Sequence, residues 1–271
     1  MVRTTGRSED VVAMAVHGSA GVRRPGCTVH TVVAYLTDVR LGEDAPTEGY
    51  PWSLPAVRRV ADLRFGDVTV LVGDNGTGKS TLVEALAVAA GFNAEGGSRN
   101  LRFRTHATHS DLSDHLRLGW RQRPRWGWFL RAETFYGMAS HIAEDDDPVS
   151  GIAAMFPDLH ARSHGESFLL LVEERMRSAC LYVLDEPESA LSIHGQLRLL
   201  AMMHEAVAEG AQFVVATHSP LLMAYPGAVI HELHAGGMDV VAWEHVDAVA
   251  LWRTVLDDPE RVLRHLFAPE D

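Results

Sequence analysis

One stretch of eight residues has the composition and spacing of a phosphate-binding loop. Residues 73–80 read Gly-Asp-Asn-Gly-Thr-Gly-Lys-Ser and match the pattern G-x-x-x-x-G-K-[ST]. Apolar residues 68–72 precede the loop as an expected strand, and residues 81–90 follow it as an expected helix. Glycines let successive backbone N–H groups converge on phosphate oxygens at the start of a helix, whose dipole favours anions. The pattern predicts a nucleotide site, and a chance match in a glycine-rich turn is the alternative.

Lys79 is the single lysine among the 24 basic residues of the chain. A compact ammonium that reaches into a phosphate cradle is not replaceable by a planar guanidinium, so this exception points to chemistry. We expect Lys79 to neutralise the β- and γ-phosphates of ATP and the Ser80 hydroxyl to bind Mg²⁺. The other expected ATP contacts in the loop and the first helical turn are Asn75, Gly76, Thr77, Gly78 and Thr81.

A second motif supplies the acids that hydrolysis needs. Residues 181–187 read Leu-Tyr-Val-Leu-Asp-Glu-Pro, an apolar strand that ends in two carboxylates. An acid at the carboxyl end of a parallel strand lies at the ligand-binding edge of such a sheet. Asp185 would belong to the Mg²⁺ shell, and Glu186 would orient or deprotonate the attacking water. The alternative is a strand that ends in a solvated acidic turn.

The elements that must position these residues are predicted by short apolar strands that alternate with helices. The alternation predicts an α/β fold with a mostly parallel sheet flanked by helices. Expected strands lie at 30–41, 65–72, 181–184, 213–216 and 229–233, with a strand beginning at 128–130; expected helices lie at 82–90, 166–177, 194–209 and 258–267.

Three segments are expected along the chain. Residues 1–28 lack a clear period and are expected to be disordered. Residues 29–235 would form the ATPase domain, with an arginine-rich and helical insertion at about 92–178. Residues 236–271 would form a C-terminal extension packed on that domain.

Composition limits the class of protein. The chain has 271 residues, of which 46% are hydrophobic, and no apolar run reaches the 18 residues that span a bilayer. We therefore expect a cytoplasmic protein. Two cysteines cannot make a disulfide framework, and Cys180 is expected to be a core thiol.

The net charge of −12 argues against a wide nucleic-acid-binding surface. A local exception runs from Arg99 to Arg131, where eight arginines stand against two acids and three tryptophans are interleaved. This region is either a solvated face or a contact for a protein or DNA client.

The order of motifs resembles that of ABC-type ATPases. Asp185-Glu186-Pro187 followed by residues 188–192 (Glu-Ser-Ala-Leu-Ser) resembles their catalytic strand and D-loop. His218, after the next expected strand, resembles their switch histidine, which contacts the γ-phosphate. The resemblance implies that Glu186, His218 and Lys79 are catalytic.

A further resemblance lies between the nucleotide motifs. Ser163-His164-Gly165-Glu166-Ser167 resembles a degenerate ABC signature, in which Ser163 and Gly165 would bind the γ-phosphate held by the opposite subunit. The same residues have the S-x-x-E spacing of a helix capping box, and both interpretations are compatible.

Within this family the chain resembles small soluble bacterial AAA-family ATPases related to SMC and RecF proteins. The resemblance implies a P-loop fold with an N-terminal antiparallel β portion and an inserted helical lobe. It also implies Mg²⁺-dependent ATP hydrolysis by a head-to-tail homodimer that acts as a switch on a protein or DNA client. The alternatives are the nucleotide-binding subunit of a membrane transporter, or a nucleotide-dependent binding module with little turnover.

Two functional residues of the family are not assigned to a single position by the sequence. Glu133 and Gln122 are candidates for the Q-loop residue, and Tyr35 and Tyr50 are candidates for the aromatic side chain that stacks on adenine.

Overall fold

A computed structural model describes residues 35–94, 111–132, 164–176 and 179–268. The segment expected to be disordered, residues 1–28, lies outside these ranges, as do Ser163, Glu133 and Cys27. Among the described residues, no helix is long and apolar enough to cross a membrane.

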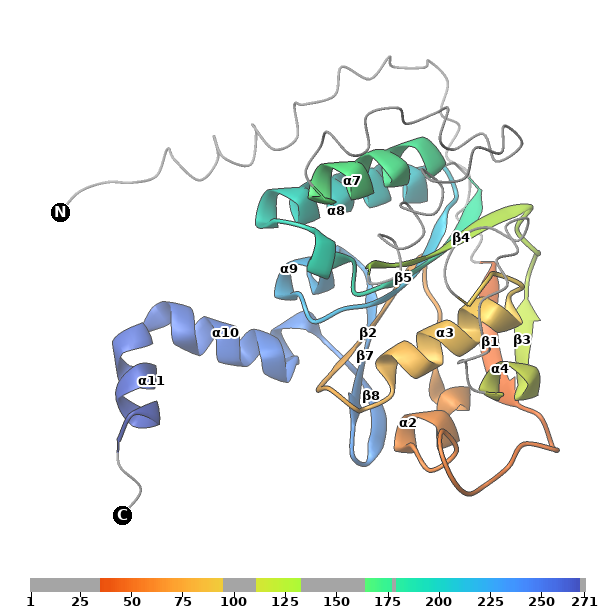
Figure 1. Cartoon of the computed structure of the whole chain (residues 1–271), viewed down its shortest axis with the longest axis horizontal. Helices are drawn as coiled ribbons and strands as arrows, with labels where there is room; N and C mark the ends of the chain where they lie inside the picture. Colours follow the sequence, from red (N-terminus) through yellow and green to blue (C-terminus); the bar gives the residue numbers. More distant parts are fainter. Residues whose placement is uncertain (1–34, 95–110, 133–163, 177–178, 269–271) are drawn as a thin grey trace.

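A six-stranded sheet forms the centre of the described part of the chain (Figure 1). Its order is β4 (Trp126–Arg131), β5 (Cys180–Asp185), β6 (Gln212–Ala216), β2 (Val68–Gly73), β7 (Val229–His234) and β8 (Gly237–Val241). Neighbouring strands are parallel from β4 to β7, and β8 is antiparallel to β7. Every residue of β5 and β6 is buried, as continuous apolar runs in a parallel sheet predict.

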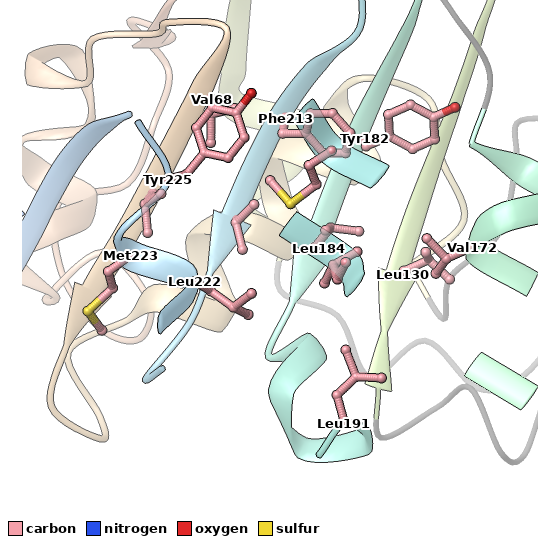
Figure 2. Packing of buried hydrophobic residues seen from close by; sticks show 14 of the residues in the cluster. Val68, Leu130, Val172, Tyr182, Leu184, Leu191, Phe213, Leu222, Met223 and Tyr225 are labelled. Atoms are coloured by element: carbon pink, nitrogen blue, oxygen red, sulfur yellow. The ribbon is translucent and has the colours of Figure 1, made fainter. Parts of the chain in front are cut away.

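Helices cover both faces of this sheet (Figure 1). On one face lie α2 (Pro55–Arg58) and α3 (Lys79–Ala89), which pack with Val183 and Val214. On the other lie α7 (His164–Arg175), α8 (Ile193–Ala208) and α9 (Pro220–Met223). Figure 2 shows this second core, where the Tyr182 and Phe213 rings stack with centroids 5.0 Å apart. The expected α/β fold is confirmed.

An antiparallel pair of strands lies beside the main sheet. β1 (Leu36–Leu41) pairs with β3 (Leu116–Trp120), which follows the short helix α4 (Leu112–His115). Gln212 joins the pair to the main sheet, because its side-chain oxygen accepts from the Leu36 N–H at 2.8 Å and its amide donates to the Leu36 carbonyl at 3.0 Å. The N-terminal antiparallel portion is thus present.

The expected insertion at 92–178 differs from the structure where it is described. Phe92, Leu112 and Leu116 are buried in the core beside α3, and β4 is a strand of the main sheet. The arginines obscure this pattern in the sequence, because they occupy exposed positions between the apolar ones. The insertion limits outside 111–132 stay a prediction.

The C-terminal segment begins with β8 and the short turn η4 (Trp243–His245), and continues as α10 (Asp247–Asp257) and α11 (Pro259–Leu266). α11 matches its prediction, with Pro259 in the first turn and Asp258 Oδ1 accepting from the Arg261 N–H at 2.9 Å. Val249 of α10 is buried, whereas α11 has no buried residue. The division of the chain at residues 236–271 stays a prediction. The two helices extend away from the body (Figure 1).

Candidate nucleotide-binding site

The predicted site residues gather at one edge of the main sheet. Strand register places Arg131 beside Asp185, and Asp185 beside Ala216, at the carboxyl ends of β4, β5 and β6. β2 ends at Gly73 on the same edge, where the expected phosphate loop begins. Ligands of α/β sheets bind outside the carboxyl ends of their strands.

Glycine conformation shapes the loop between β2 and α3. Gly73 has φ +141° and Gly78 has φ +98°, in the left-handed half of the map that side chains rarely adopt. A Cβ on Gly73 would overlap the Leu233 carbonyl oxygen of β7, so no other residue fits there. Because α3 begins at Lys79, directly after Gly78, its first N–H groups open onto the loop.

Lys79 is held inside the loop. Its Nζ donates to the Gly73 carbonyl at 2.8 Å and to the Asp74 carbonyl at 3.0 Å, and only 4% of the residue is exposed. Burial lowers the pKa of Lys79, and the carboxylates of Glu186 and Asp185 oppose that shift. An anion in the loop would complete the neutralisation of this buried ammonium.

Asp185 shares a buried ion-pair network with two other side chains. Arg131 Nε donates to Asp185 Oδ2 at 3.0 Å, and Arg131 Nη2 donates to Glu84 Oε2 of α3 at 2.7 Å. Burial raises the pKa of Asp185, and the Arg131 guanidinium and the Ser80 hydroxyl oppose the rise. Asp185 Oδ1 is buried and accepts no hydrogen bond within the described structure. One oxygen of this carboxylate is therefore fixed and the other stays available.

Glu186 and His218 meet next to this network. Glu186 has φ +47° and ψ +51°, and its N–H donates to the Ala216 carbonyl at 2.9 Å. His218 Nε2 lies 3.7 Å from Glu186 Oε1. The short turn η3 (Pro187–Ala190) follows, and its Glu188 Oε1 accepts from the His218 N–H at 2.5 Å. The D-loop region thus fixes the segment that carries the histidine.

The signature candidate lies apart from the phosphate loop. Gly165, in the first turn of α7, is so close to η3 that a Cβ on it would lie 2.9 Å from the Ala190 carbonyl oxygen. It lines a pocket of about 430 Å³ together with residues of η3 and α8, among them Ser192 and Arg198. No residue of the phosphate loop lines this pocket.

The structure places the candidates for the adenine-stacking residue at different sites, and it also locates Gln122, a candidate for the Q-loop residue. The hydroxyl of the exposed Tyr50 lies 2.9 Å from Thr81 Oγ1, beside the phosphate loop, whereas Tyr35 is buried at the start of β1. Gln122 is exposed in the turn that precedes β4, at the end of that strand opposite to Asp185. Of the two aromatic candidates, only Tyr50 lies beside the phosphate loop.

Sequence reasoning missed Arg131, Glu84 and Glu188 as parts of the site. Arg131 was grouped with an arginine-rich segment, although it ends an apolar strand as Asp185 does. That shared position was the available signal. Nothing local identifies Glu84, because its partner lies 47 residues away.

Comparison with known proteins supports this reading. Residues 68–119 match a family model described as "AAA domain, putative AbiEii toxin, Type IV TA system". The cytochrome c biogenesis ATP-binding export protein CcmA of Rhodopseudomonas palustris (strain BisB18) is 30% identical over 184 residues, which cover 65% of this chain and 88% of that protein. The hemin import ATP-binding protein HmuV of Aliivibrio fischeri is 28% identical over 209 residues, covering 68% and 78%.

Among solved structures, the SMC head domain from Thermotoga maritima is 19% identical and covers 66% of this chain and 91% of that one, with a TM-score of 0.37. A likeness at this level carries no argument about function, which rests on the sequence relatives. Their similarity confirms the resemblance on which the expected activity depends. The chain belongs to the ABC-type P-loop ATPases, enzymes that bind and hydrolyse ATP.

Proposed function

We propose that the chain hydrolyses ATP in sites that two copies share, and that the cycle of closure and opening acts as a switch on a client. The proposal rests on one observation: the residues expected to contact the γ-phosphate lie in two separate places. Lys79, Glu186 and His218 lie at one sheet edge, whereas Gly165 lines a pocket that includes no phosphate-loop residue. A second copy would supply the missing side.

The residues present fit a Mg²⁺ ion. Asp185 Oδ1 is a buried carboxylate oxygen with no hydrogen-bond partner in the described residues, and the Ser80 hydroxyl lies close enough to affect the pKa of Asp185. Hard oxygen donors of this kind suit Mg²⁺. Ser80 and Asp185 would hold the ion, which when bound would neutralise charge on the phosphate oxygens.

The side chains then divide the chemistry of hydrolysis. Glu186 would orient a water and accept its proton as the water oxygen bonds to the γ-phosphorus. The bond between that phosphorus and the β,γ-bridging oxygen breaks, which gives ADP and phosphate. Lys79 would neutralise the charge on the β- and γ-phosphates, and His218 would contact the γ-phosphate from the side of β6.

Ser163 and Gly165 of the second copy would bind the same γ-phosphate from the opposite side. ATP would shift the population toward the closed pair, because only that state contacts the γ-phosphate from both sides. Hydrolysis removes the differential contact and lets the pair open.

A client contact is supported at the turn between β3 and β4. Arg121, Arg123 and Arg125 are exposed there and take part in no ion pair in the described structure, and Arg123 lies over the Trp120 ring at 5.8 Å from its centroid. Such a surface suits an anionic partner, either DNA or an acidic protein segment.

A transporter subunit is the second candidate, because the relatives named above are export and import ATP-binding proteins. It predicts that ATPase activity of the purified chain requires membrane subunits. A binding module with little turnover is disfavoured by Glu186, which such a module does not need.

The test compares ATPase rates and binding of a fluorescent ATP analogue in wild type, Glu186→Gln and Lys79→Ala. Glu186→Gln should lower kcat by about 100-fold or more, the usual effect of losing a general base, and should keep nucleotide affinity. Lys79→Ala should lose affinity. Glu244→Gln, at an exposed site in η4, is the matched control and should leave both unchanged. Turnover that survives in Glu186→Gln would contradict the assigned role.

A further inference from the structure

Arg131 joins the two elements that carry the proposed Mg²⁺ ligands. Ser80 lies in the first turn of α3, and Asp185 ends β5. Arg131 ends the neighbouring strand β4, in register with Asp185. Its Nε donates to Asp185 Oδ2 at 3.0 Å, and its Nη2 donates to Glu84 Oε2 of α3 at 2.7 Å. One guanidinium therefore connects the helix of one ligand to the strand of the other.

Glu84 lies one helical turn after Ser80 in α3. Side chains four residues apart in a helix lie on the same face. The ion pair between Glu84 and Arg131 therefore restrains the face of α3 that carries the Ser80 hydroxyl. That hydroxyl is close enough to Asp185 to act on its carboxylate. The two proposed ligands thus lie close together, on the two elements that Arg131 joins.

The contacts of Arg131 are largely shielded from water. The exposed fraction is 19% for the side chains of Arg131 and Glu84 and 4% for that of Asp185. The guanidinium carbon also lies 5.7 Å from the centroid of the Phe129 ring. Because a guanidinium presents its donors in a rigid planar fork, it fixes the relative positions of two carboxylates that it binds at once.

The pair with Arg131 also determines which oxygen of Asp185 is available. Oδ2 accepts from Arg131, and the buried Oδ1 has no hydrogen-bond partner among the described residues. Mg²⁺ requires near-ideal octahedral coordination, with ligand oxygens at about 2.0–2.1 Å. Its affinity therefore depends on how accurately two ligands on separate elements are placed.

Stability alone is a poor explanation for these three buried charges. Well-packed apolar residues in place of a buried ion-pair network often leave a protein equally stable or make it more stable. The network lies at the carboxyl ends of β4 and β5, beside the proposed ligands. Its position favours a role in the site.

We propose that Arg131 and Glu84 are positioning residues for Mg²⁺: they hold the Ser80 helix and the Asp185 carboxylate at the spacing that the ion requires. Neither residue would bind the ion itself. This role rests on the proposed assignment of Ser80 and Asp185 as the Mg²⁺ ligands.

The test measures how strongly Mg²⁺ improves nucleotide binding. The Kd of a non-hydrolysable fluorescent ATP analogue is determined in EDTA and in Mg²⁺, and the ratio of the two values gives the coupling between ion and nucleotide. Arg131→Lys keeps the charge but loses the planar fork. It should keep the Kd in EDTA and lower the ratio by up to about tenfold, the lower end of the usual effect of residues that support metal ligands. An unchanged ratio overturns the proposal.

Ca²⁺ distinguishes lost positioning from general damage to the site. This ion accepts longer and more flexible coordination than Mg²⁺. The ratio measured with Ca²⁺ should therefore fall less in Arg131→Lys than the ratio measured with Mg²⁺. Equal losses for the two ions would contradict a role in setting the ligand spacing.

Glu84 variants test whether this residue acts through Arg131. Glu84→Ala should lower the Mg²⁺ ratio, whereas Glu84→Gln keeps an acceptor for Nη2 and should keep most of the wild-type ratio. Glu84→Ala combined with Arg131→Lys should lower the ratio no further than the stronger single variant, because both disturb one set of contacts. Additive losses would show that Glu84 acts independently.

Controls separate this role from folding and from the proposed Mg²⁺ site. Circular dichroism and urea denaturation identify the variants that are folded under the assay conditions, and Glu84→Ala serves if Arg131→Lys is not. Arg59→Lys disturbs an exposed pair, in which Arg59 Nε donates to Asp62 Oδ2 at 2.7 Å, and should leave the ratio unchanged. A wild-type ratio of one contradicts the Mg²⁺ ligands and the positioning role together. A wild-type ratio above one that Asp185→Asn lowers and Arg131→Lys does not overturns the positioning role alone.

Discussion

Glu186 has a left-handed backbone conformation, and its carboxylate lies near the carboxylate of Asp185. Its φ of +47° is uncommon for any residue with a side chain. Its carboxylate, like those of Asp185 and Glu188, acts on the Lys79 ammonium. Burial is the main cause of the raised pKa of Asp185, and the neighbouring Glu186 carboxylate raises it further, as two like charges do. Strain and repulsion at one residue are typical of a position selected for chemistry rather than for stability.

Glu186→Gly should therefore stabilise the nucleotide-free protein by about 1 kcal/mol, because glycine adopts the left-handed region without strain. Glu186→Gln should stabilise it less, since it removes only the charge. Urea denaturation of the two variants and wild type measures both effects. Glu244→Gly, in an ordinary turn, should be destabilising. A Glu186→Gly variant less stable than wild type would show that the side chain holds the turn in place.

Arg131, unlike Glu186, is expected to stabilise the folded protein. Arg131→Met leaves Glu84 and Asp185 as buried carboxylates without their cation, and should lower the free energy of unfolding by about 3 kcal/mol. Adding Glu84→Gln should recover part of the loss, because one buried charge is then removed. Chemical denaturation of the single and double variants measures this coupling. Arg121→Met, at an exposed turn, should change stability by less than about 0.5 kcal/mol. Additive effects would contradict a shared network.

At the scale of elements, local signals predicted most of the fold. The strands at 181–184 and 213–216 are continuous apolar runs, and the helix at 82–90 follows a phosphate loop, so type and order were readable. β8 and α10 were not predicted. β8 begins with Gly237 directly after the Ala235–Gly236 turn and exposes Asp239 and Val240, so it is not a continuous buried apolar run. In α10, Val249 is the buried residue, so the helix carries little core-facing pattern.

Contacts between residues that lie far apart in the chain could not be predicted from the sequence. Gln212 looks like the polar start of a buried strand, yet its side chain bonds Leu36, 176 residues away. The register that puts Arg131 beside Asp185 is likewise set by two strands packing together. The motifs identified the residues that carry the candidate chemistry, and only the fold showed the network that orients them.

His231 of β7 gives an element-scale prediction. It is fully buried, and its Nε2 lies 3.0 Å from the Arg64 N–H nitrogen, which joins β7 to the segment before β2. Burial lowers the pKa of His231 from the ordinary 6.5. The folded state therefore resists protonation, and the stability present above pH 6.5 is lost as the pH falls through 6.5 toward the lower folded value.

Between pH 7.5 and 5.5, wild type should lose more stability than His231→Gln, by up to about 1.4 kcal/mol per pH unit below 6.5. Glutamine keeps an acceptor for Arg64 but does not titrate. Urea denaturation at several pH values gives the difference, and His245→Gln at an exposed site is the control. Parallel pH profiles for wild type and His231→Gln would contradict the assignment.

At the scale of the whole molecule, hydrolysis in a shared site requires two copies to meet. The specific ATPase activity of wild type should therefore rise with protein concentration, because only the closed pair contacts the γ-phosphate from both sides. Steady-state rates over a hundredfold range of concentration measure this, and Glu244→Gln should give the same profile as wild type. A specific activity that stays the same at every concentration would contradict a pair that assembles on ATP.

The most direct test of the shared site is complementation between two inactive chains. Lys79→Ala removes the phosphate-loop lysine, and Ser163→Arg blocks the signature, so each variant alone should have no functional site. A mixed pair, coexpressed with different tags, contains one site with an intact Lys79 and an intact Ser163 from opposite copies. The account predicts ATPase activity in the purified mixed pair at least several-fold above either parent. Activity in Ser163→Arg alone, or none in the mixed pair, would contradict hydrolysis in a site that two copies share.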